Sequence, residues 1–125
     1  MDVLIVESSV ELAQLWQRHL VRQGAEVSIA TSGDEAVSQV TERAFDVIIL
    51  DLVLTKGSAL AVADYVQFRQ PNSSVIFVTD TTFFSDGSIF SLNANARAFV
   101  RTSTPPEDIA AMVEHYGRHD QSASA

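Results

Sequence analysis

The feature that most constrains the fold is a regular alternation of short apolar runs with segments of helical length. Such runs are typical of strands buried on both faces of a sheet. They recur roughly every 20 to 28 residues in a strand–helix alternation, centred on Leu4–Val6, Val27–Ile29, Phe45–Leu50, Val75–Val78 and Ala98–Val100. Parallel strands need crossovers of about a dozen residues or more, usually helical, and each connection here is long enough. The pattern predicts a doubly wound (βα)5 α/β fold, a five-stranded parallel sheet with helices on both faces.

The connecting segments carry signals for helix ends. Gly24 is placed to end the first helix in a left-handed turn, and Ser32 to Glu35 form a capping-box pattern. The segment 59–69 has apolar residues all around a helix, which predicts a well-buried helix. Residues 104–107 combine an N-cap, a proline and a glutamate at the start of the last helix. The segment 81–94 gives the weakest helix signal.

Length and composition indicate one domain. We expect the domain at residues 1–118 and a flexible tail or linker stub at 119–125. The 16 acidic residues outnumber the 8 scattered basic ones, for a net charge of −8, which disfavours binding to nucleic acid. No apolar run is long enough to cross a membrane, so membrane association is not expected. The chain has no cysteine and no basic signal-peptide start, which suits a cytoplasmic location.

Polar residues follow the predicted strands where a site is expected. The carboxyl ends of all strands in a doubly wound sheet meet at one edge, where such folds build their sites. That edge would collect Glu7, Ser8, Asp51, Thr79, Arg101 and Thr102. Carboxylates held close together repel one another and recruit a cation, of which Mg²⁺ is the most plausible. A carboxylate is also a covalent nucleophile toward phosphoryl groups, which makes Asp51 the first candidate.

Several segments, taken in order, carry a resemblance to a known family. They are Val3–Ser8, Gly24–Val27, Ala30–Ala36, Phe45–Leu52, Val75–Thr79 and Ala96–Val100. Together they resemble the response-regulator receiver domain of two-component signalling, over residues 2–116. The resemblance implies the flavodoxin-like form of the α/β fold. It also implies a signalling domain of a phosphorelay, not an enzyme.

The resemblance assigns roles to individual residues. It implies that Asp51 is the phosphoacceptor for a histidine kinase or phosphotransfer protein. It implies that the Thr79 hydroxyl grips the phosphoryl oxygen, and that Phe99 is the aromatic that changes rotamer. A weakened Mg²⁺ site would use Asp51, the backbone carbonyl of Val53, and Glu7, which is long enough to reach the metal. The implied partners are a downstream protein or output domain, with a homodimer as a further option.

The sequence departs from the family pattern at the positions that carry chemistry. Ser8 replaces the second acidic residue after the first strand, and Thr102-Ser103 replaces a lysine-proline pair after the fifth. The only lysine, Lys56, lies in the loop after Asp51. A proline and two glycines of the pattern are replaced by Thr55, Ala59 and Asn95. We expect a trans peptide bond before Ser103, because a cis bond to a residue other than proline costs roughly 3 kcal/mol.

Two other functions stay open. The runner-up is a pseudo-receiver, an interaction module that works without phosphorylation, because the metal and phosphate positions are altered. The minor alternative is an enzyme like the aspartate-nucleophile phosphatases. Those enzymes need a second aspartate two residues after the nucleophile, where this chain has Val53. Dinucleotide binding is disfavoured because no glycine-rich loop follows any predicted strand.

Overall fold

The computed structural model contains a single parallel sheet. It describes residues 1–80 and 96–124, the last seven of these by their backbone alone. The strands lie in the order β2-β1-β3-β4-β5 and all pair in parallel. Along the chain the elements are β1 (Asp2–Val6), α1 (Val10–Arg22), β2 (Glu26–Ala30), α2 (Gly33–Glu42), β3 (Val47–Asp51), α3 (Ala59–Arg69), β4 (Ser74–Thr79), β5 (Ala96–Arg101) and α5 (Pro106–Ser124). The helix expected within 81–94, and Asn95, lie outside the described residues.

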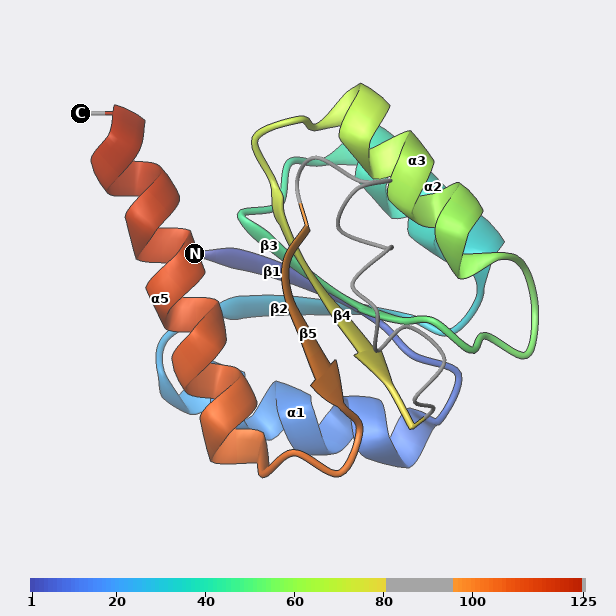
Figure 1. The fold of residues 1–125 in the computed structure, drawn as a ribbon, viewed down its shortest axis with the longest axis horizontal. Coiled ribbons are helices and arrows are strands. Elements are labelled where there is room, and N and C mark those ends of the chain that lie inside the picture. The colour runs from blue at the N-terminus through green and yellow to red at the C-terminus, as the bar shows by residue number, and fades with distance from the viewer. Residues whose placement is uncertain (81–95, 125) are drawn as a thin grey trace.

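Helices cover both faces of the sheet, which confirms the doubly wound fold (Figure 1). α1 and α5 pack on one face, through Trp16, Leu20, Ile109 and Val113. α2 and α3 pack on the other, through residues such as Val40 and Val62. Alternate residues of the central strands supply the two cores because successive side chains of a strand point to opposite faces. None of the described helices combines the length and apolar character needed to cross a membrane.

The centre of the sheet is its most buried part. Every residue of β3, including the terminal Asp51, is buried. β1 lies between β2 and β3, so the chain order reverses beside β1. In open α/β sheets this reversal leaves a crevice at the carboxyl ends of the two diverging strands. The residues that follow β1 and end β3, Glu7 and Asp51, are therefore adjacent.

The helix ends predicted at Ser32 and Gly24 are confirmed, and Ser9 and Ser58 are two further N-caps. The hydroxyl groups of Ser9, Ser32 and Ser58 accept hydrogen bonds from the third residue of α1, α2 and α3, as N-caps do. Gly24 has a φ of +92°, the predicted left-handed turn after α1.

One helix, α3, is less buried than the sequence predicts. α3 is not buried all around: its outer stripe exposes 41% of Leu60 and 81% of Phe68. Among the described elements, its main contacts are with α2 and β3.

α5 is assigned to Ser124; the domain boundary at residue 118, with a flexible tail or linker stub at 119–125, stays a prediction. Gly117 lies inside α5, buried against Met1, where an added Cβ would approach the methionine Cε within 2.5 Å. This glycine permits close packing and does not end the helix; its cost in helix propensity is only about 1 kcal/mol.

Candidate functional site

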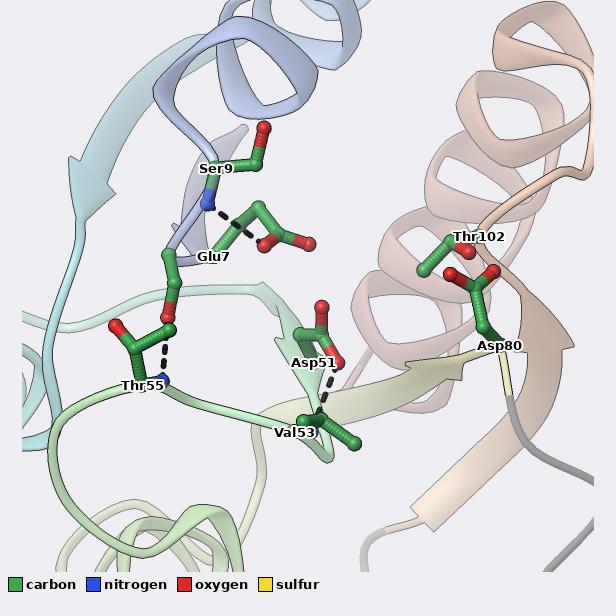
Figure 2. A pocket seen from close by; sticks show the side chains of 8 residues that line it. Glu7, Ser9, Asp51, Val53, Thr55, Asp80 and Thr102 are labelled. Carbon is green, nitrogen blue, oxygen red and sulfur yellow. Dashed lines mark hydrogen bonds between the residues drawn. The ribbon is translucent and has the colours of Figure 1, made fainter.

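A cleft of about 440 Å³ opens at the carboxyl edge of the sheet (Figure 2). The elements that meet there are those the sequence predicts. Its walls are formed by residues that follow or end four strands: Glu7, Ser8, Ser9, Asp51, Val53, Thr55, Asp80 and Thr102. Seven of these eight side chains are polar, and three are carboxylates, so the cleft is suited to a charged ligand.

Glu7 is a buried carboxyl group with an unused oxygen. Its side chain is 3% exposed. Oε2 accepts a hydrogen bond from the Ser9 N–H at 2.9 Å, whereas Oε1 has no hydrogen-bond partner among the described residues. Burial is the main cause that raises the pKa of Glu7 from 4.5 to about 8; a side-chain hydrogen bond with Asp51, which the protonated form of Glu7 can make, and the charge of Asp51 act in the same direction, and the N–H groups of Ser9 and Ser8 oppose them. Glu7 is therefore largely protonated at neutral pH when no cation is bound.

Asp51 is held in one orientation at the end of β3. It is 7% exposed, and its Oδ1 accepts a hydrogen bond from the Val53 N–H at 2.8 Å. Figure 2 shows its carboxyl group and that of Glu7 facing the same space. Glu7 and Asp51 therefore offer oxygen atoms to one small cation, and the orphaned Oε1 fits Mg²⁺, which prefers oxygen ligands. No group of three His, Cys, Asp or Glu residues within the described ranges is placed to hold a metal ion. Any Mg²⁺ would rely on two carboxylates.

One hydrogen bond, between the end of β1 and the loop that joins β3 to α3, accounts for two departures from the family pattern. The Ser8 hydroxyl accepts a hydrogen bond from the Thr55 N–H at 2.9 Å. A proline at position 55 would have no N–H to donate. Ser8 in place of an acid and Thr55 in place of a proline are thus complementary: they fasten the loop to the end of β1.

The same loop is fixed at two further points. The Leu52 N–H donates to the Val78 carbonyl, and the Gly33 N–H donates to the Lys56 carbonyl. Gly57 adopts a φ of +97° and packs against Gly33, where an added Cβ would lie 3.0 Å from the Gly33 Cα. The loop that forms one wall of the cleft is therefore held on both sides.

Of the other candidate residues, some line the cleft and others do not. Thr79, the last residue of β4, is 1% exposed and does not line the cleft. Phe99 is partly buried on β5, with its ring centroid 6.3 Å from that of Phe77. Thr102 lines the cleft, while Arg101 is exposed and does not. The peptide bond before Ser103 is trans, as expected.

Asp80 lines the cleft, although it is not among the site residues predicted from the sequence. It follows Thr79 directly and lines the cleft beside Thr102, across from Glu7 (Figure 2). Its position after a buried strand was the signal that could have found it. With Asp80, three carboxylates and no Lys, Arg or His line the cleft in the described part of the chain. Lys56 is exposed in the loop and is not among the residues that line the cleft.

Known regulatory proteins share part of this sequence. The chain is 30% identical over 79 residues to the transcriptional regulatory protein DltR of Streptococcus agalactiae, covering 63% of this chain and 35% of DltR. It is 28% identical over 78 residues to the transcriptional regulatory protein ZraR of Escherichia coli O157:H7, covering 62% of this chain and 18% of ZraR. The chain thus spans about a third or less of the length of these relatives.

Solved structures share the whole fold. A CheY-like response regulator receiver domain protein from Methanospirillum hungatei superposes with a TM-score of 0.88 at 22% identity, over 98% of this chain and 97% of that one. The N-terminal domain of a response regulator/sensory box/GGDEF 3-domain protein from Carboxydothermus hydrogenoformans gives 0.86 at 25% identity, over 100% of both chains.

A match over most of the sequence identifies the family to which the chain belongs. The profile of the response regulator receiver domain matches residues 3–114, from β1 into α5. That range includes Glu7, Asp51, the whole of β2 to β5, and β1 from Val3 onward. The chain therefore belongs to the response-regulator receiver domain family of two-component signalling.

Proposed function

We propose that this receiver domain accepts a phosphoryl group on Asp51 from a histidine kinase or phosphotransfer protein, in the cytoplasm. One observation carries the proposal. The Asp51 carboxylate ends a strand that is buried along its whole length, faces an open cleft, and has one oxygen fixed by the Val53 N–H. A nucleophile held in this way needs little reorganisation to meet its substrate.

The chemistry is a transfer between two side chains. The hydrogen bond from Val53 occupies Oδ1, so Oδ2 is the oxygen that attacks phosphorus. A bond forms between Oδ2 and phosphorus as the bond between phosphorus and the donor's imidazole nitrogen breaks. The donor ring is protonated on its other nitrogen, so it leaves as neutral imidazole. Thr79 would donate its hydroxyl to the new phosphoryl group. Because Thr79 is 1% exposed, that contact requires a shift of its side chain, to which Phe99 would respond.

A divalent cation would assist the transfer. Glu7, Asp51 and the backbone carbonyl of Val53 would hold Mg²⁺, and the unpartnered Oε1 of Glu7 supports this assignment. When bound, the ion neutralises charge on the phosphoryl oxygens. Ser8 is not included, since its hydroxyl already accepts the Thr55 N–H.

The output is a change of partner binding and not turnover of a substrate. DltR and ZraR are transcriptional regulatory proteins, and the chain matches only part of each. A downstream protein or an output domain, or a second copy in a homodimer, would read the phosphorylated state. A phosphatase-like activity is not proposed, because Val53 offers no proton two residues after Asp51.

A second candidate is a pseudo-receiver, an interaction module that works without phosphorylation. Two observations favour it. Ser8 is engaged by the loop, and no Lys, Arg or His within the described ranges lines the cleft. A phosphoryl group on Asp51 would then lack a positive charge from the chain itself.

One titration separates the two functions. Beryllofluoride, a phosphoryl mimic, is added with Mg²⁺ to isotope-labelled protein, and the amide signals of Asp51 and Thr79 are followed by NMR. Saturable shifts at millimolar Mg²⁺, absent in Asp51→Asn, support phosphorylation. No saturable response in a folded protein would contradict it and leave the pseudo-receiver.

A further inference from the structure

α3 is a helix with apolar residues on both of its faces. Its inner face packs through buried residues that include Val62, Ala63 and Val66. Its outer face leaves Phe68 81% exposed and Leu60 41% exposed. A helix that is apolar all around is normally buried all around, because each apolar face is covered by another element. α3 therefore has a second apolar face that is open in the structure.

The exposed residues of α3 form one stripe along the helix. Leu60, Asp64 and Phe68 are spaced four residues apart, which places them on the same face of a helix. All three are exposed, and Ala61 is exposed beside them. The helix lies beside α2 on the sheet, and its inner face is already used (Figure 1). The stripe is thus an apolar–acidic–apolar surface available for a further contact.

The acid at the centre of the stripe lacks a counter-charge. The Asp64 side chain makes no hydrogen bond or ion pair with the residues that the structure describes. It lies between the two large apolar side chains, so any helix that packs on both of them also faces this carboxylate. A basic side chain at that point would pair with Asp64 while its neighbours cover the apolar surface.

The same charge disfavours a second copy of this chain as the occupant. An antiparallel pair centred on Asp64 would place Leu60 of each chain against Phe68 of the other. A parallel pair would place each residue against its own equivalent. In both alignments the two copies of Asp64 oppose each other, and like charges in contact are unfavourable. The net charge of −8 also repels a second copy and attracts a basic partner.

We propose that the outer face of α3 is a docking surface for an amphipathic helix of a partner protein. The partner helix carries a lysine or arginine with an apolar residue one turn away on each side. The apolar residues pack on Leu60 and Phe68, and the basic residue pairs with Asp64. None of these three residues lines the cleft at Asp51, so docking does not require phosphorylation. A contact through one helical stripe is small, which is typical of a transient complex.

The test uses the full chain and two matched peptides. The probe is a helical peptide of alanine and glutamine with one lysine, flanked by a leucine one turn before and one turn after it. The control peptide has glutamate in place of that lysine. Binding is followed by the amide signals of Ala61 and Phe68 in NMR at low ionic strength. We expect saturable shifts with the lysine peptide and an affinity lower by roughly threefold or more for the glutamate peptide. Added salt should reduce this difference.

Variants place the binding on the stripe. Asp64→Lys should reverse the preference, so that the glutamate peptide binds more tightly than the lysine peptide. Phe68→Ala should weaken both peptides by several-fold, because it removes apolar contact surface. Val21→Ala is the control: Val21 is a 53% exposed residue of α1, and its loss should leave both affinities unchanged. The three substituted side chains are exposed, so the variants should fold, which urea denaturation checks.

Several results would overturn the proposal. They are absence of saturation, equal binding of the two peptides, an unchanged preference in Asp64→Lys, or equal weakening by Val21→Ala and Phe68→Ala. Sedimentation equilibrium without peptide tests the other occupant. A dimer that Phe68→Ala abolishes would show that a second copy covers this face and would contradict a basic partner. A monomer that binds the lysine peptide supports the proposal, whatever the result of the beryllofluoride titration.

Discussion

At the scale of single residues, Glu7 has the most unusual environment. Its carboxyl is buried beside Asp51, and its pKa is raised from 4.5 to about 8, chiefly by burial. A group whose pKa is higher in the folded state keeps its proton over a range in which the unfolded chain has lost it. Between about pH 4.5 and 8 the folded state therefore binds more protons, and stability must fall as the pH rises through that window.

The first prediction is that Glu7→Gln removes this pH dependence. In metal-free buffer, the free energy of unfolding of the natural chain should decrease from pH 5 to pH 8, by at most about 1.4 kcal/mol per pH unit for one proton. Urea titrations followed by the fluorescence of Trp16, which is 1% exposed, measure it. Glu7→Gln cannot ionise and should give a flatter profile. Parallel profiles for the two proteins would show that another group is responsible.

At the scale of elements, the loop from Leu52 to Ser58 determines the shape of the cleft. It is fastened to β1 through Ser8, to β4 through Val78, and to the start of α2 through Gly33. The sequence predicts the loop but not these attachments, because a serine hydroxyl and a backbone N–H carry no sign of which partner the fold will bring to them. The pairing of Ser8 with Thr55 is visible only once β1 and β3 lie side by side.

The second prediction compares two glycines with the same backbone conformation. Gly57 and Gly24 have φ values of +97° and +92°. A Cβ added at Gly57 would lie 3.0 Å from the Gly33 backbone, whereas a Cβ added at Gly24 would meet nothing within 4 Å. Gly24→Ala should therefore lower the free energy of unfolding by about 1 kcal/mol, the cost of a left-handed backbone conformation for a residue with a Cβ. Gly57→Ala should lower the free energy of unfolding by at least about 1 kcal/mol more than Gly24→Ala does, because the backbone atoms of residues 33 and 57 must move apart.

Urea denaturation of both variants measures the difference. A shift of the Ser9 or Thr55 amide signal in Gly57→Ala, absent in Gly24→Ala, would show that the distortion reaches the cleft wall. Equal destabilisation by the two substitutions would mean that the Gly33–Gly57 approach is not tight in solution.

At the scale of the whole molecule, most of the fold follows from the sequence. Buried β-branched runs such as Val47–Leu50 predict the strands, and each connection is long enough for a helical crossover between parallel strands. The site is predicted in part. Asp51 and Glu7 lie at the expected edge, because topology alone brings the ends of β1 and β3 together. Asp80 and the burial of Thr79 were not predicted, since they depend on how deeply each strand end sits in the packed sheet.

The third prediction concerns how stability is distributed over this sheet. β3 is buried along its whole length and pairs on both sides, whereas β2 is an edge strand whose first four residues are exposed or partly exposed. Hydrogen-bonded amides of β3 should exchange with solvent only through global unfolding, so their exchange free energy should equal that from urea denaturation. Bonded amides of β2 should exchange through smaller openings and give lower values in native-state hydrogen exchange by NMR. Equal protection of the two strands would mean that the sheet opens as a single unit. Greater protection of β3 would mean that Asp51 is anchored in the part of the sheet that opens last.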